Sequence, residues 1–365
     1  MSKLLLIGAG CSRNYLKTNS AFPNIDCPLD RDFFLIAKKV ILQGLIDQNL
    51  LQMIDGIIND LCKLYGYEPV DVYSIEINSP DATKILEVLD DKRLSLEKVM
   101  TELSLEMGLF LQQPPFYGFR FNEKGDYLDL LSPLIELIAV TISKALEGPP
   151  CSNHKKLAES LGNGDSVISF NYDILMDNAL RNSHKLTDYG YLVPFQKSLE
   201  DPQWTRPEDT PSEVELLKLH GSMNWLHCSY CGSYFLTRSE KMGSWYVSLP
   251  KNCPKCRNSS DYLERVIIPP LLAKDYSAQP INYLWREAAR RLSRTREVIV
   301  IGYSFPPTDF AVEALLRSGL PWNCQKETHF TIVDPDKNVF ERFSQRFNMA
   351  KVDWKGSLAE YLDNL

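Results

Sequence analysis

Short runs of apolar residues, several of them followed by a helical pattern, are the feature that most limits how this chain can fold. Such runs are typical of parallel strands that are buried on both faces, and they lie at 3–8, 166–170, 214–219, 265–269, 297–302 and 329–333. Apolar residues at helical spacing follow at 172–181, 280–293, 309–317 and 338–347. This alternation predicts an α/β fold with a Rossmann-like, doubly wound parallel sheet.

Two interruptions of the alternation predict insertions. Roughly 150 residues separate the first strand from the second, far more than one crossover needs, and their helical periodicity predicts a helical insertion at 41–154. The second interruption, 223–261, is rich in Cys, Ser, Gly and Lys and poor in aliphatic residues, so it needs a staple to fold. The Rossmann domain would then comprise 1–40, 155–222 and 262–365.

The second interruption contains two Cys-x-x-Cys pairs. They are separated by 21 residues and consist of Cys228, Cys231, Cys253 and Cys256. Four thiolates complete a tetrahedral shell, which is typical of structural Zn²⁺ in a zinc ribbon. The alternatives are unligated reduced cysteines or a redox pair. The remaining cysteines show no pairing pattern and read as core or surface thiols: Cys11, Cys27, Cys62, Cys151 and Cys324.

Charge and hydropathy exclude some classes of protein. The net charge of −7 argues against nucleic acid as a direct partner. No apolar stretch approaches the roughly 20 residues that cross a bilayer, and "MSKLLLIGAGCS" reads as a buried first strand rather than a leader. We therefore expect a cytoplasmic protein with reduced thiols and no membrane partner.

Polar and glycine-containing turns follow several predicted strands. Because the carboxyl ends of parallel strands meet at one edge of the sheet, these turns are candidates for a ligand site. The residues are Gly8, Ala9, Gly10 and Ser12 after the first strand, Asn171 and Asp173 after the second, His220 after the third, and Gly302, Ser304 and Asp334 near the C-terminal end. Each has a simpler reading: a tight turn, a helix cap, or a histidine that fills space at a strand end.

The order of these motifs resembles that of the sirtuin family. Sirtuins have a Gly-Ala-Gly-x-Ser turn, an Asn-x-Asp motif, a His-Gly turn just ahead of a four-cysteine ribbon, and then a glycine- and serine-containing turn. Here the corresponding residues are Gly8–Ser12, Asn171 with Asp173, His220-Gly221, the four ribbon cysteines, and Gly302 with Ser304. The resemblance covers about 1–40, 160–270 and 295–340 and leaves the helical insertion unexplained.

Three departures separate the chain from the deacylases of that family. Phe170 stands where deacylases usually have Gln, and "VIIPPLLAKD" replaces their Phe-Gly-Glu stretch. Two prolines there remove amide donors that binding an extended peptide needs. The Pro-Asp-Phe-Arg stretch of the family's cofactor loop is echoed only by "PLDRDFF", in which Phe33 and Asp32 are the matching residues. With the helical insertion, these features resemble the sirtuin-like NAD-hydrolysing effectors of bacterial antiphage defence, although most of those lack a ribbon.

The resemblance implies an NAD⁺ glycohydrolase that produces nicotinamide and ADP-ribose. It assigns His220 as the general base, Asn171 as the residue that positions ribose and water, and Asp173 as the contact to the nicotinamide carboxamide. The diphosphate would be bound by Gly8, Ala9, Gly10 and Ser12, and other cofactor contacts would come from Phe33, Gly302, Ser304 and Asp334. The alternatives are an NAD-dependent protein deacylase and a non-catalytic NAD or ADP-ribose sensor.

The resemblance also implies a regulated homo-oligomer, with a HerA-like ATPase or another defence protein as its candidate partner. An apolar stripe in the helical insertion, formed by Tyr127, Leu130, Leu131, Leu134 and Leu137, either contacts such a partner or packs inside the insertion.

Overall fold

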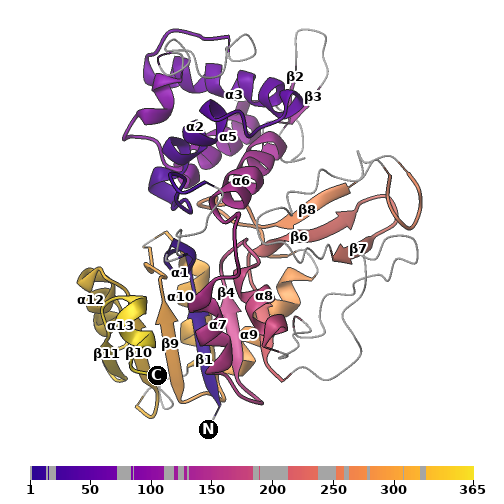
Figure 1. Ribbon diagram of the computed structural model, residues 1–365. Coiled ribbons are helices and arrows are strands. Elements are labelled where there is room, and N and C mark those ends of the chain that lie inside the picture. The colour runs from indigo at the N-terminus through magenta and orange to yellow at the C-terminus, as the bar shows by residue number, and fades with distance from the viewer. Residues whose placement is uncertain are drawn as a thin grey trace. The chain divides into compact units, whose positions relative to one another are not determined.

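The protein divides into two compact units, each described here by itself (Figure 1). The sheet unit comprises 1–20, 148–268 and 275–365, and the helical unit comprises 21–147 and 269–274. The computed structural model describes residues 2–13, 15, 22–71, 84, 86–110, 119–121, 127–129, 131–183, 189, 213–236, 252–258, 263–277, 280–306, 308–320 and 326–365.

A six-stranded parallel sheet organises the sheet unit. Its strands, in spatial order, are β11 (Lys351–Trp354), β10 (His329–Val333), β9 (Glu297–Ile301), β1 (Lys3–Ile7), β4 (Ser166–Ser169) and β5 (Glu215–Lys218). Numbered along the chain, this order is 3-2-1-4-5-6, which is that of a Rossmann fold. The predicted fold class is therefore confirmed, and the point where the strand order reverses lies between β1 and β9.

The sheet is buried on both faces, as its apolar strands require. Leu4, Leu5, Leu6 and Ile7 of β1 are all buried. The helices predicted to follow the strands are present as α8 (Leu175–Asn182), α9 (Ile281–Leu292), α10 (Phe310–Gly319) and α12 (Lys337–Arg346), and α7 (Ser152–Glu159) and α13 (Leu358–Leu362) accompany them. In α9 the buried residues include Ile281, Leu284, Ala288 and Leu292, an apolar stripe at helical spacing that places one face of the helix in the core.

The apolar run at 265–269 was wrongly predicted to be a strand of the main sheet. It lies in β8 (Leu263–Ile267), which pairs antiparallel with β6 (Gly221–Cys228) in a separate sheet of order β7-β6-β8, where β7 is Ser233–Leu236. Burial varies along β8, from buried Leu263 and Ile267 to exposed Glu264, as expected of an antiparallel strand with one wetter face. The sequence also missed β11, a half-exposed edge strand.

The helical unit contains the helices of the first long insertion, over bounds that differ from 41–154. It contains η2 (Asp30–Asp32), α2 (Phe33–Leu42), α3 (Gln48–Tyr65), η3 (Glu87–Asp90), α5 (Leu96–Phe110), α6 (Leu131–Ala145) and the hairpin of β2 (Phe119–Phe121) and β3 (Tyr127–Asp129). It begins at 21 because α2 packs against α6 and η3 of the same unit. No helix in the described part of the chain combines the length and apolar character that spanning a membrane requires.

The apolar stripe of the helical insertion packs inside this unit. Leu131, Leu134 and Leu137 of α6 are all buried. Leu130 and the side chain of Tyr127 lie outside what the structure describes. The three leucines therefore contribute to the core of the helical unit and not to an exposed surface.

Candidate functional site

Glycines after β1 and β9 bring two turns into direct backbone contact. The amide of Gly8 donates to the carbonyl of Ile301 at 3.0 Å, and that of Gly10 to the carbonyl of Gly302 at 2.8 Å. A Cβ added to Gly302 would lie 2.1 Å from the amide nitrogen of Cys11, and one on Gly10 would lie 2.8 Å from the Cα of Gly302. Since no side chain fits between these backbones, the two turns interlock at the point where the strand order reverses.

The interlock changes what the first turn can offer a ligand. The turn is a short helix, α1 (Ala9–Arg13), in which Ala9 is exposed and Ser12 is buried. The sequence predicted backbone amides directed at a diphosphate, but those of Gly8 and Gly10 donate to carbonyls of the second turn, and that of Cys11 donates to the carbonyl of Gly8 at 2.9 Å. The glycines therefore serve close packing between the two turns, because a side chain at Gly10 or Gly302 would clash with the backbone of the other turn.

Asn171 and Asp173 meet this turn through Ser12. Asn171, which follows β4, donates from Nδ2 to the carbonyl of Gly8 at 3.0 Å and to Ser12 Oγ at 2.9 Å. Ser12 Oγ in turn donates to Asp173 Oδ2 at 2.6 Å. Three of the predicted site residues thus form one buried hydrogen-bonded chain, which joins Ser12 to two residues that lie about 160 positions further along the sequence.

This chain fixes the orientation of the Asn171 side chain. A backbone carbonyl only accepts hydrogen bonds, so the amino group of the amide must face Gly8 and the amide oxygen must face the other way. That oxygen, Asn171 Oδ1, is buried and has no hydrogen-bond partner among the described residues. A buried acceptor left unsatisfied costs about 1–3 kcal/mol, which a bound hydroxyl or water would offset.

Asp173 also supports the start of α8, as the simpler reading of the motif predicted. Its Oδ1 accepts from the amide of Leu175 at 2.9 Å while its Oδ2 accepts from Ser12. The backbone carbonyl of Asp173 accepts from Lys218 Nζ. Asp173 therefore supports the first turn of α8, whose N-cap residue is Ile174, and also ends the Asn171–Ser12 chain.

A buried ionic network beneath this turn was not predicted from the sequence. Lys218 Nζ on β5 lies 3.1 Å from Asp177 Oδ2 on α8, and Tyr189 donates to Asp177 Oδ1 at 2.6 Å. Lys218, Asp177 and Tyr189 are all buried. The one signal in the sequence is a lysine at the end of an apolar run, in "VELLKL". Because Lys218 also binds the Asp173 carbonyl, the network holds the Asn171–Asp173 turn against β5.

His220 lies at the end of β5 among aromatic rings. Its ring centroid is 5.2 Å from that of Phe170 and 6.4 Å from that of Tyr172, the two neighbours of Asn171 in the chain. The rings of Tyr276 and Trp285 lie 6.3 and 6.2 Å away. His220 is only 7% exposed, and its carbonyl accepts from the amide of Ile268 at 2.9 Å. The imidazole is thus held in an apolar surrounding beside the Asn171 turn.

Two further predicted cofactor residues follow β9 and β10. Ser304 is exposed, and its carbonyl accepts from Arg342 Nη2 at 2.7 Å. Asp334 Oδ1 accepts from the amide of Asp336 at 2.9 Å. Burial, followed by the nearby charge of Asp336, raises the pKa of Asp334 above its usual value. The structure therefore places Ser304 and Asp334 after strands that neighbour each other in the sheet.

Phe33 differs from the other predicted cofactor residues because it belongs to the helical unit. It begins α2, is buried, and makes an edge contact with Phe34 at 5.2 Å between ring centroids. Its local role is to fill the core of the helical unit.

The four predicted zinc ligands converge at the far end of the β7-β6-β8 sheet. The four sulfur atoms all lie within 4.8 Å of one another and belong to Cys228, Cys231, Cys253 and Cys256. The separations between Cys228 and Cys256 and between Cys231 and Cys253 are both 3.8 Å. A tetrahedron with Zn–S bonds of about 2.3 Å has sulfurs about 3.8 Å apart, so the donor set fits zinc.

The two cysteine pairs lie in matching turns. The amide of Gly232 donates to the carbonyl of Cys228, and the amide of Arg257 donates to the carbonyl of Cys253. Gly232 and Arg257 both have a left-handed backbone, with φ of +66° and +64°. The neighbouring His227 contacts Glu264 and stacks on Tyr234 and is not one of the four converging ligands. The matching turns direct all four thiols inward, and four sulfur ligands leave no open position on a metal.

Solved structures similar to the chain include several Sir2 homologues. A triple mutant in complex with 2′-O-acetyl ADP ribose has 18% identity over 67% of this chain and 75% of the other, with a TM-score of 0.38. A homologue in complex with NAD has 17% identity over 72% and 83% of the two chains and a TM-score of 0.36. A mutant homologue in complex with ADP-ribose has 16% identity over 100% and 90%, with a TM-score of 0.39.

No curated protein matches the chain. The family model described as a SIR2-like domain matches residues 165–351. This match contains the Asn171–Asp173 turn, His220, the four ribbon cysteines and the turns after β9 and β10. The chain therefore belongs to the SIR2-like domain family.

Proposed function

We propose that this protein is an NAD⁺ glycohydrolase, which uses water to cleave the bond between nicotinamide and ribose and releases nicotinamide, ADP-ribose and a proton. Membership of the SIR2-like domain family supports NAD⁺ as the substrate. The observation that carries the proposal is the oriented amide of Asn171, whose Oδ1 is a buried acceptor without a hydrogen-bond partner among the described residues.

Asn171 suits the demands of this reaction. Loss of nicotinamide leaves a ribose with the character of an oxocarbenium ion, which a correctly placed hydroxyl or water must then meet. Because its amino group is held by Gly8 and Ser12, Asn171 presents the oxygen in one orientation. Such an acceptor can bind a ribose hydroxyl or the incoming water without reorganising, which is the basis of a preorganised site.

His220 is the proposed general base. Near neutral pH an imidazole exchanges a proton readily, because its ordinary pKa lies near 6.5. The rings of Phe170, Tyr276 and Trp285 limit bulk water around it. Phe170 also lies 4.8 Å from the ring of Tyr303, so this side of the site is filled by aromatic side chains. These aromatic side chains leave little room for an extended acyl-peptide. Pro269 and Pro270, which directly follow Ile268, also have no amide hydrogen to donate to such a peptide, so a small substrate is favoured.

The remaining assignments concern binding. We assign the diphosphate to the turn formed by Gly8, Ala9, Gly10 and Ser12, where the glycines contribute close backbone packing and not their own amides, which are already bonded. We assign the nicotinamide carboxamide to Asp173 and other cofactor contacts to Gly302, Ser304 and Asp334. Zn²⁺ bound by the four ribbon cysteines would hold the β7-β6-β8 sheet together and take no part in the chemistry, because its shell is complete.

Incubating the purified protein with NAD⁺ tests the proposal. Release of nicotinamide and ADP-ribose without any peptide is expected. Release only in the presence of an acetylated peptide would indicate a deacylase, and binding without turnover would indicate a sensor. Either of these results would contradict the proposal.

Substitutions at the two central residues test the assignment of roles. Asn171→Ala and His220→Ala should each lower turnover by about 10²–10⁴-fold while NAD⁺ affinity falls much less. Asn178→Ala is a matched control, since Asn171 and Asn178 are both 6% exposed asparagines of the sheet unit, and it should retain turnover. Near-normal cleavage by His220→Ala would show that the histidine only fills space at the strand end.

An enzyme with this activity depletes the NAD⁺ of its own cell, so we further propose that it is held at low activity and acts in antiphage defence. Its partners would be further copies of this chain and a HerA-like ATPase or another defence protein. Size-exclusion chromatography with light scattering, combined with the NAD⁺ assay, tests this. A monomer that cleaves NAD⁺ at full rate without a partner would contradict it.

A further inference from the structure

A histidine lies between two cysteines in the sheet unit, outside the proposed site. His154 Nδ1 is 3.1 Å from Cys151 Sγ, and His154 Nε2 is 3.5 Å from Cys11 Sγ. His154 and Cys11 are fully buried, and Cys151 is 4% exposed. Cys11 belongs to α1, whereas His154 and Cys151 lie at the start of α7, so only the folded sheet brings the three together.

The geometry resembles that of an activated thiol. A thiol in hydrogen-bond contact with an imidazole at the start of a helix loses its proton more easily than an isolated thiol. Burial alone would raise the pKa of Cys151, but the hydrogen bond and charge of His154 outweigh burial and lower that pKa. Burial would likewise lower the pKa of His154, but contact with Cys11 and Cys151 raises it well above the usual value. Both directions favour a thiolate beside an imidazolium.

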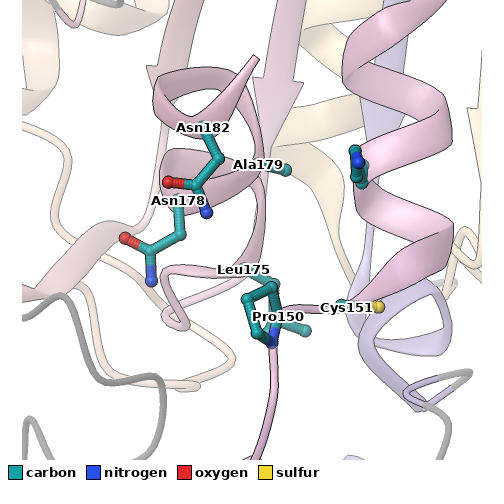
Figure 2. Close-up of a pocket in the computed structure, with 7 residues that line it drawn as sticks. Pro150, Cys151, Leu175, Asn178, Ala179 and Asn182 are labelled. Atoms are coloured by element: carbon teal, nitrogen blue, oxygen red, sulfur yellow. The ribbon is translucent and has the colours of Figure 1, made fainter. Parts of the chain in front are cut away.

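Access to this thiol is narrow. Cys151 forms part of the wall of a small pocket between α7 and α8, together with Pro150, Lys155, Leu175, Asn178, Ala179 and Asn182. In Figure 2 the sulfur of Cys151 points away from Asn178 and Asn182 on the opposite wall. The thiol is therefore shielded from large reagents, and a reactant that reaches it must be small.

The geometry points to Cys151 as a modification site, a thiol activated by His154 that a small hydroperoxide such as hydrogen peroxide oxidises to a sulfenic acid. The Cys151 thiolate attacks one peroxide oxygen, so that an S–O bond forms as the O–O bond breaks. The hydroxide that leaves takes the proton of the His154 imidazolium and becomes water. The sulfur is oxidised by two electrons and the peroxide is reduced, which places Cys151 on the first step of the cysteine oxidation ladder.

The chain contains good internal references for such a reaction. Cys62 is 1% exposed and Cys27 is 5% exposed, so their exposure brackets that of Cys151. Burial raises the pKa of Cys62. If burial alone decided reactivity, these three thiols would react at similar rates. If His154 activates Cys151, then Cys151 must react faster.

The experiment treats the full-length protein with dilute hydrogen peroxide for increasing times, removes the peroxide, and then unfolds the protein in the presence of a 1,3-dicarbonyl probe that traps sulfenic acids. Labelling of each cysteine is measured by peptide mass spectrometry, so the rate reports oxidation in the folded protein and not access of the probe. Labelling of Cys151 is expected to exceed that of Cys62 and Cys27 by about tenfold, because the imidazole of His154 favours the Cys151 thiolate. Equal rates at the three cysteines in the wild-type protein would overturn the inference, and that comparison needs no variant.

Two substitutions separate the role of His154 from a general loosening of the structure. His154→Asn keeps a polar side chain but supplies no proton, and should slow labelling of Cys151 toward that of Cys62. Cys11→Ala removes the other neighbour of His154 and should leave Cys151 labelled at close to the wild-type rate. The inference fails if folded His154→Asn protein is labelled as fast as wild type, or if Cys11→Ala abolishes labelling of Cys151.

Discussion

Replacing Gly302 by alanine tests whether the interlocked turns after β1 and β9 stabilise the sheet unit. Gly302 has a φ of +59°, a conformation that costs a non-glycine residue about 1–2 kcal/mol. Its new Cβ would also lie 2.1 Å from the nitrogen of Cys11 and 2.4 Å from the carbonyl carbon of Gly10. Both are backbone atoms that cannot swing away, and overpacking of this kind costs about 1–3 kcal/mol. The free energy of unfolding should therefore fall by roughly 2–5 kcal/mol.

Gly164→Ala supplies the matched control within the same unit. Gly164 also has a left-handed backbone, with a φ of +89°, but a Cβ there would meet no atom within 4 Å. Gly164→Ala should therefore lower the free energy of unfolding only by the cost of the left-handed backbone, about 1–2 kcal/mol. All tryptophans of the chain fall within the ranges of the sheet unit, so tryptophan fluorescence during urea unfolding reports on that unit. Equal destabilisation by the two substitutions would show that the contact between the turns contributes nothing.

Two other predictions concern the ribbon and the buried ionic network. Cys253→Ser should release about one zinc per chain and make the segment around β6–β8 sensitive to protease. The control variant Cys27→Ser should keep the metal. Freshly purified wild-type protein that contains no zinc by elemental analysis would contradict the ribbon assignment. Lys218→Met should lower the free energy of unfolding by about 3–5 kcal/mol, because it leaves the carboxylate of Asp177 buried without its cation. Adding Asp177→Asn should recover part of that loss, and a double variant less stable than Lys218→Met would refute this explanation.

The main sheet was predictable because its inner strands are continuous apolar runs, which only burial on both faces explains. Four cysteines at knuckle spacing likewise defined the ribbon. β11 was not predicted, because its sequence, "KVDW", is half polar and the strand lies at the edge of the sheet. β8 was assigned to the wrong sheet because a run such as "RVIIP" does not reveal its pairing partner, and β6, its partner, lies some forty residues earlier in the chain.

The candidate site was predictable to the extent that its residues follow strands. Asn171, Asp173 and Ser12 could be expected at one edge, but nothing in the sequence shows that Asn171 binds Gly8 and so orients its own oxygen. The glycines were visible, yet their contact with Gly302 depends on the pairing of β1 with β9. Phe33 was assigned by likeness to a loop, whereas its burial in α2 of the helical unit follows from packing. His154 carries no motif, because Cys11, one of its two thiol neighbours, lies far away along the chain.

The central position of β1 determines when the main sheet can form during synthesis, because β1 needs partners from two distant parts of the chain. Leu5 lies opposite Val167 on one side and opposite Ile299 on the other. β1 therefore leaves the ribosome well before β9 and gains its second neighbour only after nearly three hundred further residues, a wait of roughly 15–60 s at about 5–20 residues per second. During that time "KLLLI" is an apolar strand with at least one open edge, the kind of segment that associates between chains. The helical unit can form earlier, because all its residues up to 147 have been synthesised by then and only the short segment 269–274 follows later. Nascent chains of this protein thus pass through a long stage in which the helical unit is nearly complete while β1 of the sheet unit still has an unpaired edge.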